Sequence, residues 1–326
     1  MVILCIVLCM QEKIIFVFPG QGAQYVGMCA DVWRDFVAAR YAFEEVSEYA
    51  GKNIAKLCFD GPGDELNKPE NVSLATFAHS VSIARVIEDE FKQSLYKMAY
   101  AITGHSMGQY SALYCAGAMT MNDAVNLLIK RAKFMTSVGA DGSMAAVVGL
   151  SHDQINQCLI RASGAGFAQI SNHNAADQFI ISGKNVALDI VVNTAKQMGA
   201  RVAKKLNVLV PAHCGLMANA EVLLRKYMEN VNLSAPKTNW YSNQTAEFMS
   251  NPLDIRDALC DQITHGVRWW EIMNTFPKYN ITRAYESGPG RVLTTLINRA
   301  NVNCVATKTA DSKSVKLVLQ DLAKIR

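Results

Sequence analysis

Gly104-His105-Ser106-Met107-Gly108 is the stretch that decides the fold of this 326-residue chain. The apolar residues 97–102 before it predict a buried strand, and residues 109–119 after it, rich in Ala, Leu and Tyr, predict a helix. A Gly-x-Ser-x-Gly pattern between a strand and a helix is typical of the sharp turn that exposes a nucleophilic serine. A chance match is the alternative, because Gly and Ser are common, but the strand–turn–helix context favours Ser106 as a nucleophile. The Met107 amide, at the N-terminus of the predicted helix, is a candidate donor to an oxyanion.

A second turn follows an earlier apolar run, residues 14–18, which is typical of a central parallel strand. The turn itself is Pro19-Gly20-Gln21-Gly22-Ala23-Gln24, at the carboxyl end of a strand, where open α/β sheets bind their ligands. It lacks the Gly-Lys-Ser/Thr ending of a phosphate-binding loop. We therefore expect the backbone amide of Gln21 to face Ser106 as the second oxyanion donor.

Composition and charge limit the classes of partner and location. The chain is 50% hydrophobic and 18% charged, which predicts a globular protein with a large core. Its net charge of +4 is too small to indicate a nucleic-acid-binding surface. The nine Cys show no metal-binding spacing, which predicts free thiols, no metal site and a cytoplasmic location.

The first ten residues are almost wholly apolar and invite a signal-peptide interpretation. No Lys or Arg precedes the run, and no small-residue cleavage site clearly follows it. Charge arrives at Glu12 and Lys13, well short of the ~20 apolar residues that span a membrane. We expect no membrane partner and treat residues 1–12 as an extension or a segment packed on the domain.

Residues 142–208 predict a small α+β unit of their own. Its elements follow a β-α-β-β-α-β order, which is ferredoxin-like. They are a strand over 143–150, a helix from Ser151, two strands within 168–182 joined by a polar turn at 172–174, a helix over 186–198 and a strand over 201–209. The predicted fold is therefore α/β, with a hydrolase-like parallel-sheet core formed by 1–141 and 209–326 and the ferredoxin-like unit inserted.

Three further residues could be catalytic or merely structural, and their residue type alone does not decide between these roles. His213 stands where an apolar run meets a loop, the usual place for a base in α/β enzymes, although a lone His is more often structural. Cys214 beside it is a rival nucleophile, but it lies on no elbow, and we interpret it as structural. Arg131, on the helix predicted over 121–135, is by default a solvated surface charge.

Four separated segments then point to a known family. They occur in the family's order and cover the chain from about Lys13 to its end. Together they resemble the malonyl-CoA–acyl carrier protein transacylases, the acyltransferases of type II fatty acid synthesis. The segments are Phe18-Pro19-Gly20-Gln21-Gly22-Ala23-Gln24, Gly104-His105-Ser106-Met107-Gly108-Gln109-Tyr110-Ser111-Ala112-Leu113, Pro211-Ala212-His213-Cys214 and Gly288-Pro289-Gly290-Arg291-Val292-Leu293.

The resemblance implies roles in nucleophilic attack, oxyanion stabilisation and substrate binding. These roles are Ser106 as the acyl-accepting nucleophile, His213 as its general base, the main-chain carbonyl of Gln262 as the group that orients the histidine, the amides of Gln21 and Met107 as the oxyanion hole, Arg131 as the ligand of the malonyl carboxylate, and Asn174 as a pocket-lining residue. Two departures stand out. Gln109 replaces a common Glu, and Ala176-Asp177 replaces a usual Pro-Gly, which puts the shape of that loop and the role of Asn174 in doubt.

The function implied is transfer of a malonyl group from malonyl-CoA to the phosphopantetheine thiol of acyl carrier protein. The partners would be these two substrates, the enzyme would be a monomer, and no cofactor would be bound permanently. A polyketide-type acyltransferase that uses another extender acid is the nearest alternative. An α/β esterase would share the elbow, but it has no use for an Arg in the acyl pocket. A carrier-protein scaffold without activity would have no need to keep Ser106, Arg131 and His213 together.

Overall fold

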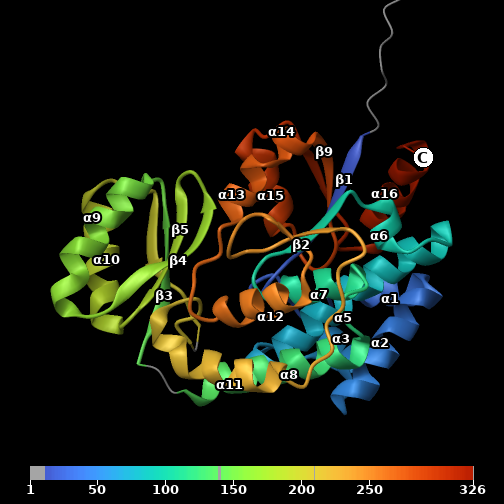
Figure 1. Ribbon diagram of the computed structural model, residues 1–326, viewed down its shortest axis with the longest axis horizontal. Helices are drawn as coiled ribbons and strands as arrows, with labels where there is room; N and C mark the ends of the chain where they lie inside the picture. The colour runs from blue at the N-terminus through green and yellow to red at the C-terminus, as the bar shows by residue number, and fades with distance from the viewer. Residues whose placement is uncertain (1–11, 139–140, 209, 326) are drawn as a thin grey trace, which may run out of the picture.

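The computed structural model describes residues 12–138, 141–208 and 210–325, and its strands form two sheets (Figure 1). The apolar residues 1–10 lie outside the described residues. In chain order the strands are β1 (Lys13–Phe18), β2 (Ala101–Gly104), β3 (Ser143–Val148), β4 (Ala168–Ala175), β5 (Gln178–Gly183), β6 (Val202–Lys205), β7 (Asn239–Tyr241), β8 (Phe248–Met249), β9 (Ile281–Glu286) and β10 (Val305–Lys308).

Helices cover both faces of the larger sheet and one face of the smaller. In chain order they are α1 (Ala30–Asp35), α2 (Val37–Ala50), α3 (Ile54–Asp60), α4 (Gly63–Leu66), α5 (Pro69–Phe91), α6 (Leu95–Met98), α7 (Gly108–Cys115), α8 (Met121–Ser137), α9 (His152–Ala162), α10 (Asn185–Gln197), α11 (Ala218–Met228), α12 (Pro252–Asp261), α13 (Trp269–Asn274), α14 (Phe276–Tyr279), α15 (Val292–Ala300) and α16 (Ser312–Ile325). Two single turns of 3₁₀ helix lie at Ser163–Ala165 and Gly215–Met217.

The larger sheet has the strand order β10-β9-β1-β2-β7-β8 and is parallel except for β8. Strand β1 lies inside it, paired in parallel with β2 and β9. Successive side chains of a strand point to opposite faces, so β1 contributes to two cores. Ile14, Phe16 and Phe18 belong to the core beneath α2, α5, α7 and α8, whereas Ile15 and Val17 belong to the core beneath α13 and α15. An apolar strand buried on both faces is what the predicted parallel α/β core requires.

The smaller sheet is antiparallel with the order β4-β5-β3-β6. Helices α9 and α10 cover its outer face, away from the larger sheet, and enclose a separate apolar core (Figure 1). This order and the β-α-β-β-α-β connection are those of a ferredoxin-like unit. The predicted fold class is therefore confirmed, while the predicted domain boundaries, 1–141 with 209–326 and 142–208, stay a prediction.

Some predicted elements have different limits. The strand predicted over 97–102 begins only at Ala101, because Leu95–Met98 form the short helix α6. The helical region that follows the turn after β1 is broken into α1, α2 and α3, since Phe36 adopts an extended backbone and Gly51 a left-handed one.

In the smaller unit, the polar turn predicted at 172–174 is wrong. These residues continue β4, and the turn comes after them at Ala176 and Asp177. Successive side chains of a strand point to opposite faces of its sheet, so a run of polar residues can belong to a strand when both faces offer polar surroundings. The strand predicted over 201–209 ends at Lys205, and Leu209 lies outside the described residues.

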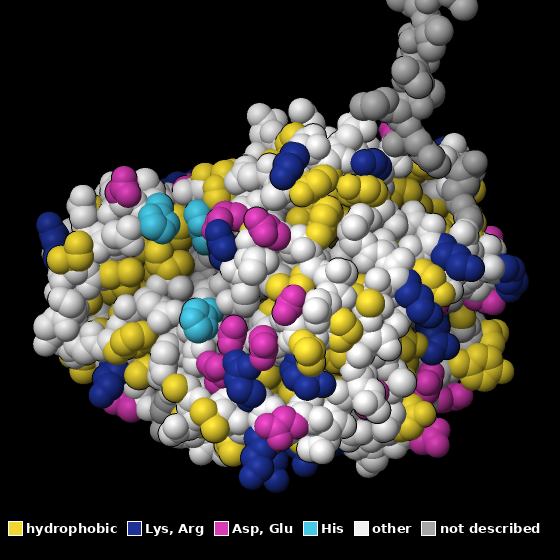
Figure 2. All heavy atoms as spheres, in the orientation of Figure 1, with side chains coloured by type: hydrophobic (Ala, Val, Ile, Leu, Met, Phe, Trp, Pro, Cys, Tyr) yellow, Lys and Arg dark blue, Asp and Glu magenta, His cyan; other side chains and the backbone are white. Residues whose placement is uncertain are grey.

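Basic and acidic side chains are interspersed on the face of the molecule shown in Figure 2. Such mixing fits the small net charge of +4. Within the described residues, no helix combines the length and the apolar character needed to cross a membrane.

Candidate active site

Ser106 lies on a strand–turn–helix elbow between β2 and α7, as the sequence predicts. Its backbone is in the left-handed region, with φ of 52°. The two flanking glycines make this turn possible. A Cβ on Gly104 would lie 2.0 Å from the carbonyl carbon of Gly108, and one on Gly108 would lie 2.2 Å from the carbonyl oxygen of Phe18. Any side chain at either position would therefore push the elbow away from β1 and β2.

His213 reaches Ser106 from the segment that follows the smaller unit. Its Nε2 lies 2.7 Å from Ser106 Oγ, and its Nδ1 lies 2.6 Å from the main-chain oxygen of Gln262. A carbonyl oxygen can only accept, so Nδ1 carries the proton and Nε2 is free to accept the serine hydroxyl proton. The arrangement is that of a serine activated by an oriented base, with a neutral carbonyl as the third member.

The environment of His213 keeps its imidazole neutral. Burial lowers its pKa from 6.5 to about 3, the positive charge of Arg131 acts in the same direction, and the hydrogen bond to Gln262 acts in the opposite one. At neutral pH the histidine is therefore in its basic form.

Arg131 comes from α8 and is only 3% exposed, so the surface-charge interpretation is wrong. Its Nη2 donates to Ser106 Oγ at 3.3 Å, and its Nε is buried without a partner. Burial lowers the pKa of its guanidinium. In residues 12–138, 141–208 and 210–325, no carboxylate pairs with it. A buried, unpaired cation beside the nucleophile is a site prepared for an anionic group.

The two expected oxyanion donors flank the serine. Gln21 lies in the turn after β1, and its neighbour Gly20 approaches the carbonyl oxygen of His105 so closely that a Cβ there would lie 2.7 Å away. Met107 precedes the first residue of α7, where helix amides are free to donate. Among the described residues, neither amide donates to a protein acceptor.

These residues meet in a cleft of about 700 Å³. Its lining includes Gln21, Ser106, Arg131, Asn174 and His213. Among the described lining residues, Arg131 is the only Lys, Arg, Asp or Glu. Gln262 contacts His213 from the side away from Ser106, where its main-chain carbonyl oxygen accepts from His213 Nδ1. Sequence reasoning therefore selected residues that the fold does bring together.

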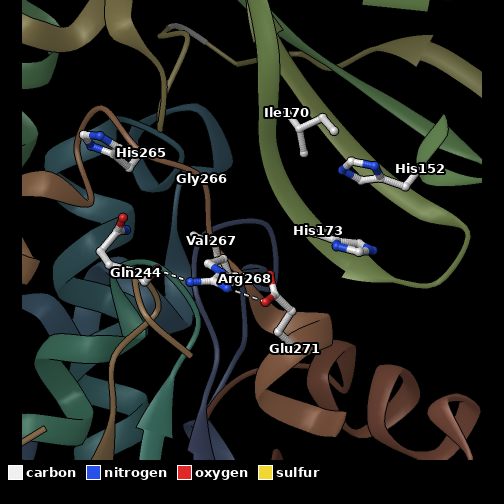
Figure 3. A pocket seen from close by; sticks show the side chains of 9 residues that line it. All are labelled: His152, Ile170, His173, Gln244, His265, Gly266, Val267, Arg268 and Glu271. Carbon is white, nitrogen blue, oxygen red and sulfur yellow. Dashed lines mark hydrogen bonds and ion pairs between the residues drawn. The ribbon is translucent and has the colours of Figure 1, made fainter. Parts of the chain in front are cut away.

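A second, smaller hollow of about 290 Å³ lies beside β4, which contributes Ile170 and His173 to its lining (Figure 3). It is lined by His152, His173 and His265 beside the Arg268–Glu271 ion pair. In the part of the chain that the structure describes, no group of His, Cys, Asp and Glu could hold a metal ion. These imidazoles do not belong to the serine site.

The chain matches the acyl transferase domain family over residues 15–263. A malonyl CoA–acyl carrier protein transacylase of Bacillus subtilis is 31% identical over 314 residues, covering 95% of this chain and 98% of that protein. The chain belongs to this family. Among solved structures, the acyl-carrier-protein S-malonyltransferase of Bartonella henselae superposes with a TM-score of 0.92 at 33% identity, covering 96% of this chain and all of that one. A malonyl transacylase in complex with a type II polyketide acyl carrier protein matches with a TM-score of 0.91 at 31% identity, covering 95% of this chain and 100% of that one.

Two departures from the transacylase pattern have structural explanations. Gln109, which stands where Glu is common, donates through Nε2 to Thr103 Oγ1 at 3.0 Å and to the carbonyl oxygens of Gly104 and Tyr241 at 2.7 and 3.1 Å. An ionised Glu could not bond to either carbonyl oxygen, because it has no proton to donate. The amide thus ties the start of α7 to β2 and β7.

At the second departure, Asp177 forms ion pairs with Arg201 and, at 3.7 Å, with Arg299. Asn174 lies in β4 before this turn and still faces the cleft, where its Oδ1 lies 2.8 Å from His105 Nε2. The changed turn therefore leaves the expected pocket-lining position of Asn174 intact.

Sequence reasoning missed Asn243, which follows β7 and is buried against the elbow. Its position after a strand at the carboxyl edge of a parallel sheet is a signal that could have selected it. Nothing in its residue type sets it apart from the many other amides of the chain.

Proposed function

We propose that this transacylase moves a malonyl group from malonyl-CoA to the phosphopantetheine thiol of an acyl carrier protein, through a malonyl ester on Ser106. The single observation that carries the proposal is the buried, unpaired guanidinium of Arg131 within 3.3 Å of the nucleophile. A serine–histidine pair alone fits many acyl donors, whereas a cation in the acyl pocket favours an acyl group that ends in a carboxylate.

Acylation begins with the thioester carbonyl beside Ser106. His213 Nε2 takes the hydroxyl proton as Ser106 Oγ attacks, and the Gln262 carbonyl holds the resulting imidazolium through Nδ1. The developing oxyanion is stabilised by the amides of Gln21 and Met107, a contribution of about 3 kcal/mol per donor in serine enzymes. The bond to the CoA sulfur breaks, and His213 returns its proton to that sulfur.

Deacylation follows the same route in reverse. The carrier protein's thiol gives its proton to His213 and attacks the malonyl ester, the oxyanion forms again in the same hole, and Ser106 leaves with the proton. No step uses a resident metal or redox cofactor, since coenzyme A and the carried phosphopantetheine are both parts of substrates. A neutral carbonyl suffices behind the histidine because thioesters are already activated.

The partners are malonyl-CoA and an acyl carrier protein, as the names of the family's members state for those proteins. The monomeric state and the cytoplasmic location stay predictions, as does the absence of nucleic-acid and membrane partners. Seven free cysteines in the described residues, all buried, fit a reducing compartment.

The test is a rapid-mixing experiment with purified protein and malonyl-CoA. We expect a burst of free CoA equal to the enzyme concentration, a malonyl group mapped by mass spectrometry to Ser106, and discharge of that group when a phosphopantetheinylated carrier protein is added. Acetyl-CoA and methylmalonyl-CoA are run in parallel.

Each alternative gives a different result. Faster labelling by methylmalonyl-CoA would favour the polyketide-type extender enzyme. A label that water removes as fast as the carrier protein does would favour an esterase. Absence of any label on Ser106 would contradict the proposed function.

A further inference from the structure

Asn243 makes three hydrogen bonds at the centre of the site while only 1% of it is exposed. Its Oδ1 accepts from the backbone N–H of Ser106 at 2.8 Å, and its Nδ2 donates to the carbonyl oxygen of Gly104 at 2.9 Å. The same Oδ1 accepts from Gln262 Nε2 at 3.2 Å. One side-chain amide therefore contacts both the nucleophile's backbone and the residue that orients the base.

The first two bonds have a clear origin in the sheet. Strands β2 and β7 pair in parallel through Ala101 with Asn239 and Ile102 with Trp240. Beyond this pairing the chain turns into the elbow, and Ser106 takes a positive φ that removes its amide from the ladder. The Asn243 side chain supplies a donor and an acceptor in place of the missing strand partner, so a backbone conformation that is costly for a non-glycine residue is held in place.

The third bond connects this elbow to the histidine. Gln262 presents its side chain to Asn243 and its main-chain carbonyl to His213 Nδ1 at 2.6 Å. Asn243 Oδ1 has two lone pairs and uses both, for Ser106 and for Gln262. The distance between Ser106 Oγ and His213 Nε2 thus depends on a short chain of buried bonds through Asn243.

The loop that carries Asn243 is itself fixed from outside. Figure 3 shows the Arg268 guanidinium between Gln244 and Glu271. It donates to the carbonyl oxygens of Gln244 at 3.0 Å and Thr245 at 3.2 Å, while the backbone N–H of Arg268 donates to the carbonyl oxygen of Asn243 at 3.1 Å. The backbone of Asn243 is therefore held by Arg268, through a bond separate from the three made by its side chain.

We propose that Asn243 is a positioning residue that sets Ser106 and His213 in register for proton transfer. The inference rests on the proposed function for its reaction, but it concerns the serine–histidine pair and not the acyl group. Asn243 touches no substrate in this role, so its loss should slow the chemical step and leave malonyl-CoA binding unchanged.

The experiment compares full-length wild type with Asn243→Ala, Asn243→Asp and Asn239→Ala. Asn239 is a matched control, because it is an asparagine at the start of β7, the strand that leads to Asn243, and its Nδ2 donates to the carbonyl oxygen of Tyr100 at 2.9 Å. Two rates are measured for each protein. One is single-turnover acylation by malonyl-CoA, and the other is phosphorylation of Ser106 by diisopropyl fluorophosphate, which releases fluoride and has no malonyl group.

We expect Asn243→Ala to lower the maximal acylation rate and the phosphorylation rate by about 10- to 100-fold, the size of effect that a misplaced reacting group produces. The half-saturating malonyl-CoA concentration should stay within about twofold. Asn243→Asp keeps both accepted bonds and loses the donated one, so it should recover part of the rate. Asn239→Ala should match wild type in all three quantities.

Wild-type rates in Asn243→Ala would overturn the proposal, as would an equal loss in Asn239→Ala or a loss confined to the half-saturating concentration. If Asn243→Ala does not fold, Asn243→Asp and Gln262→Ala serve in its place. Gln262→Ala keeps the main-chain carbonyl and removes one donor to Asn243 Oδ1, and wild-type rates in both variants would refute the inference. A wild-type protein that reacts with the fluorophosphate but not with malonyl-CoA would contradict the proposed function alone, and the rates of phosphorylation by the fluorophosphate would then decide the role of Asn243.

Discussion

Replacement of Arg131 by alanine should convert a malonyl-selective site into one with little preference between malonyl and acetyl groups. The side chain is 3% exposed, and Nη2 lies 3.3 Å from the oxygen that becomes acylated. A malonyl group on Ser106 carries its carboxylate two carbons beyond the ester oxygen, within reach of the guanidinium. With alanine in its place, nothing else among the described lining residues bears a positive charge at neutral pH.

The size of the effect follows from burial. An ionised carboxylate that leaves water without a partner is strongly destabilised, and removal of one member of a buried charge pair typically costs about 2–5 kcal/mol. Since 1.4 kcal/mol corresponds to a factor of ten, malonyl transfer should fall on the order of a hundredfold or more. Acetyl transfer should be unchanged or faster, because a neutral acyl group leaves the cation unpaired in a desolvated pocket.

The assay is single-turnover acylation of Ser106 by malonyl-CoA and by acetyl-CoA, with the ratio of the two rates as the readout. Arg131→Lys should recover only part of the malonyl rate, because an ammonium cannot make two parallel hydrogen bonds to a carboxylate. Lys133→Ala is the matched control, since Lys133 lies on the same helix with an exposed side chain. It should retain the wild-type ratio.

An unchanged malonyl-to-acetyl ratio in Arg131→Ala would refute the reasoning. So would an equal loss with both donors, because it would show that the guanidinium supports Ser106 or the fold and does not bind the carboxylate. Thermal unfolding of each variant separates the second outcome from simple destabilisation.

Three further outcomes follow from the serine–histidine geometry. Ser106→Ala should give no covalent adduct of about 86 Da with malonyl-CoA, and an adduct mapped to Cys214 in that variant would show that the nucleophile has been misassigned. His213→Ala should slow acylation by about two to four orders of magnitude while Cys214→Ala stays near wild type, so equal losses would contradict the base assignment. Because the pKa of His213 is lowered to about 3, the neutral base is retained as pH falls and is lost only near that value. The kcat/KM for malonyl-CoA should therefore be flat between pH 7 and 5. A decline in kcat/KM centred near the ordinary histidine pKa of 6.5 would be inconsistent with a buried base. Because the charge of Arg131 helps to lower the pKa of His213, Arg131→Ala should move the decline to higher pH.

The elbow could be predicted from sequence because local rules determine it. Gly104 and Gly108 are required by close backbone approach, and the strand before and helix after Ser106 are visible as an apolar run and a helical pattern. The ferredoxin-like order of the inserted unit was equally visible in the alternation of strands and helices. Its polar segment at 172–174 was not, since a short polar run is compatible with a turn or with a strand, and only the pairing of β4 with β5 decides between them.

The role of Arg131 shows where such rules end. From residue type alone it is one cation among many, and only the packing of α8 against the cleft buries it without a carboxylate. The resemblance to the transacylases supplied its expected role, and the geometry then gave a physical reason for it. The third member behind His213 was hidden in a different way, because the group that orients the imidazole is a main-chain carbonyl, and a backbone atom leaves no mark on the choice of residue.

Asn243 joins these two kinds of hidden contact. Its amide replaces a strand partner for the backbone of Ser106 and reaches the side chain of Gln262, whose carbonyl holds His213. Each bond joins segments that are well separated in the chain, so no local pattern could connect them. A neutral network also suits the electrostatics of the site. A carboxylate in place of the Gln262 carbonyl would raise the pKa of His213 and offset the charge of Arg131 that the malonyl group requires. The uncharged support of the histidine and the unpaired cation are therefore two aspects of one arrangement, in which the negative charge nearest to Arg131 is left for the substrate to bring.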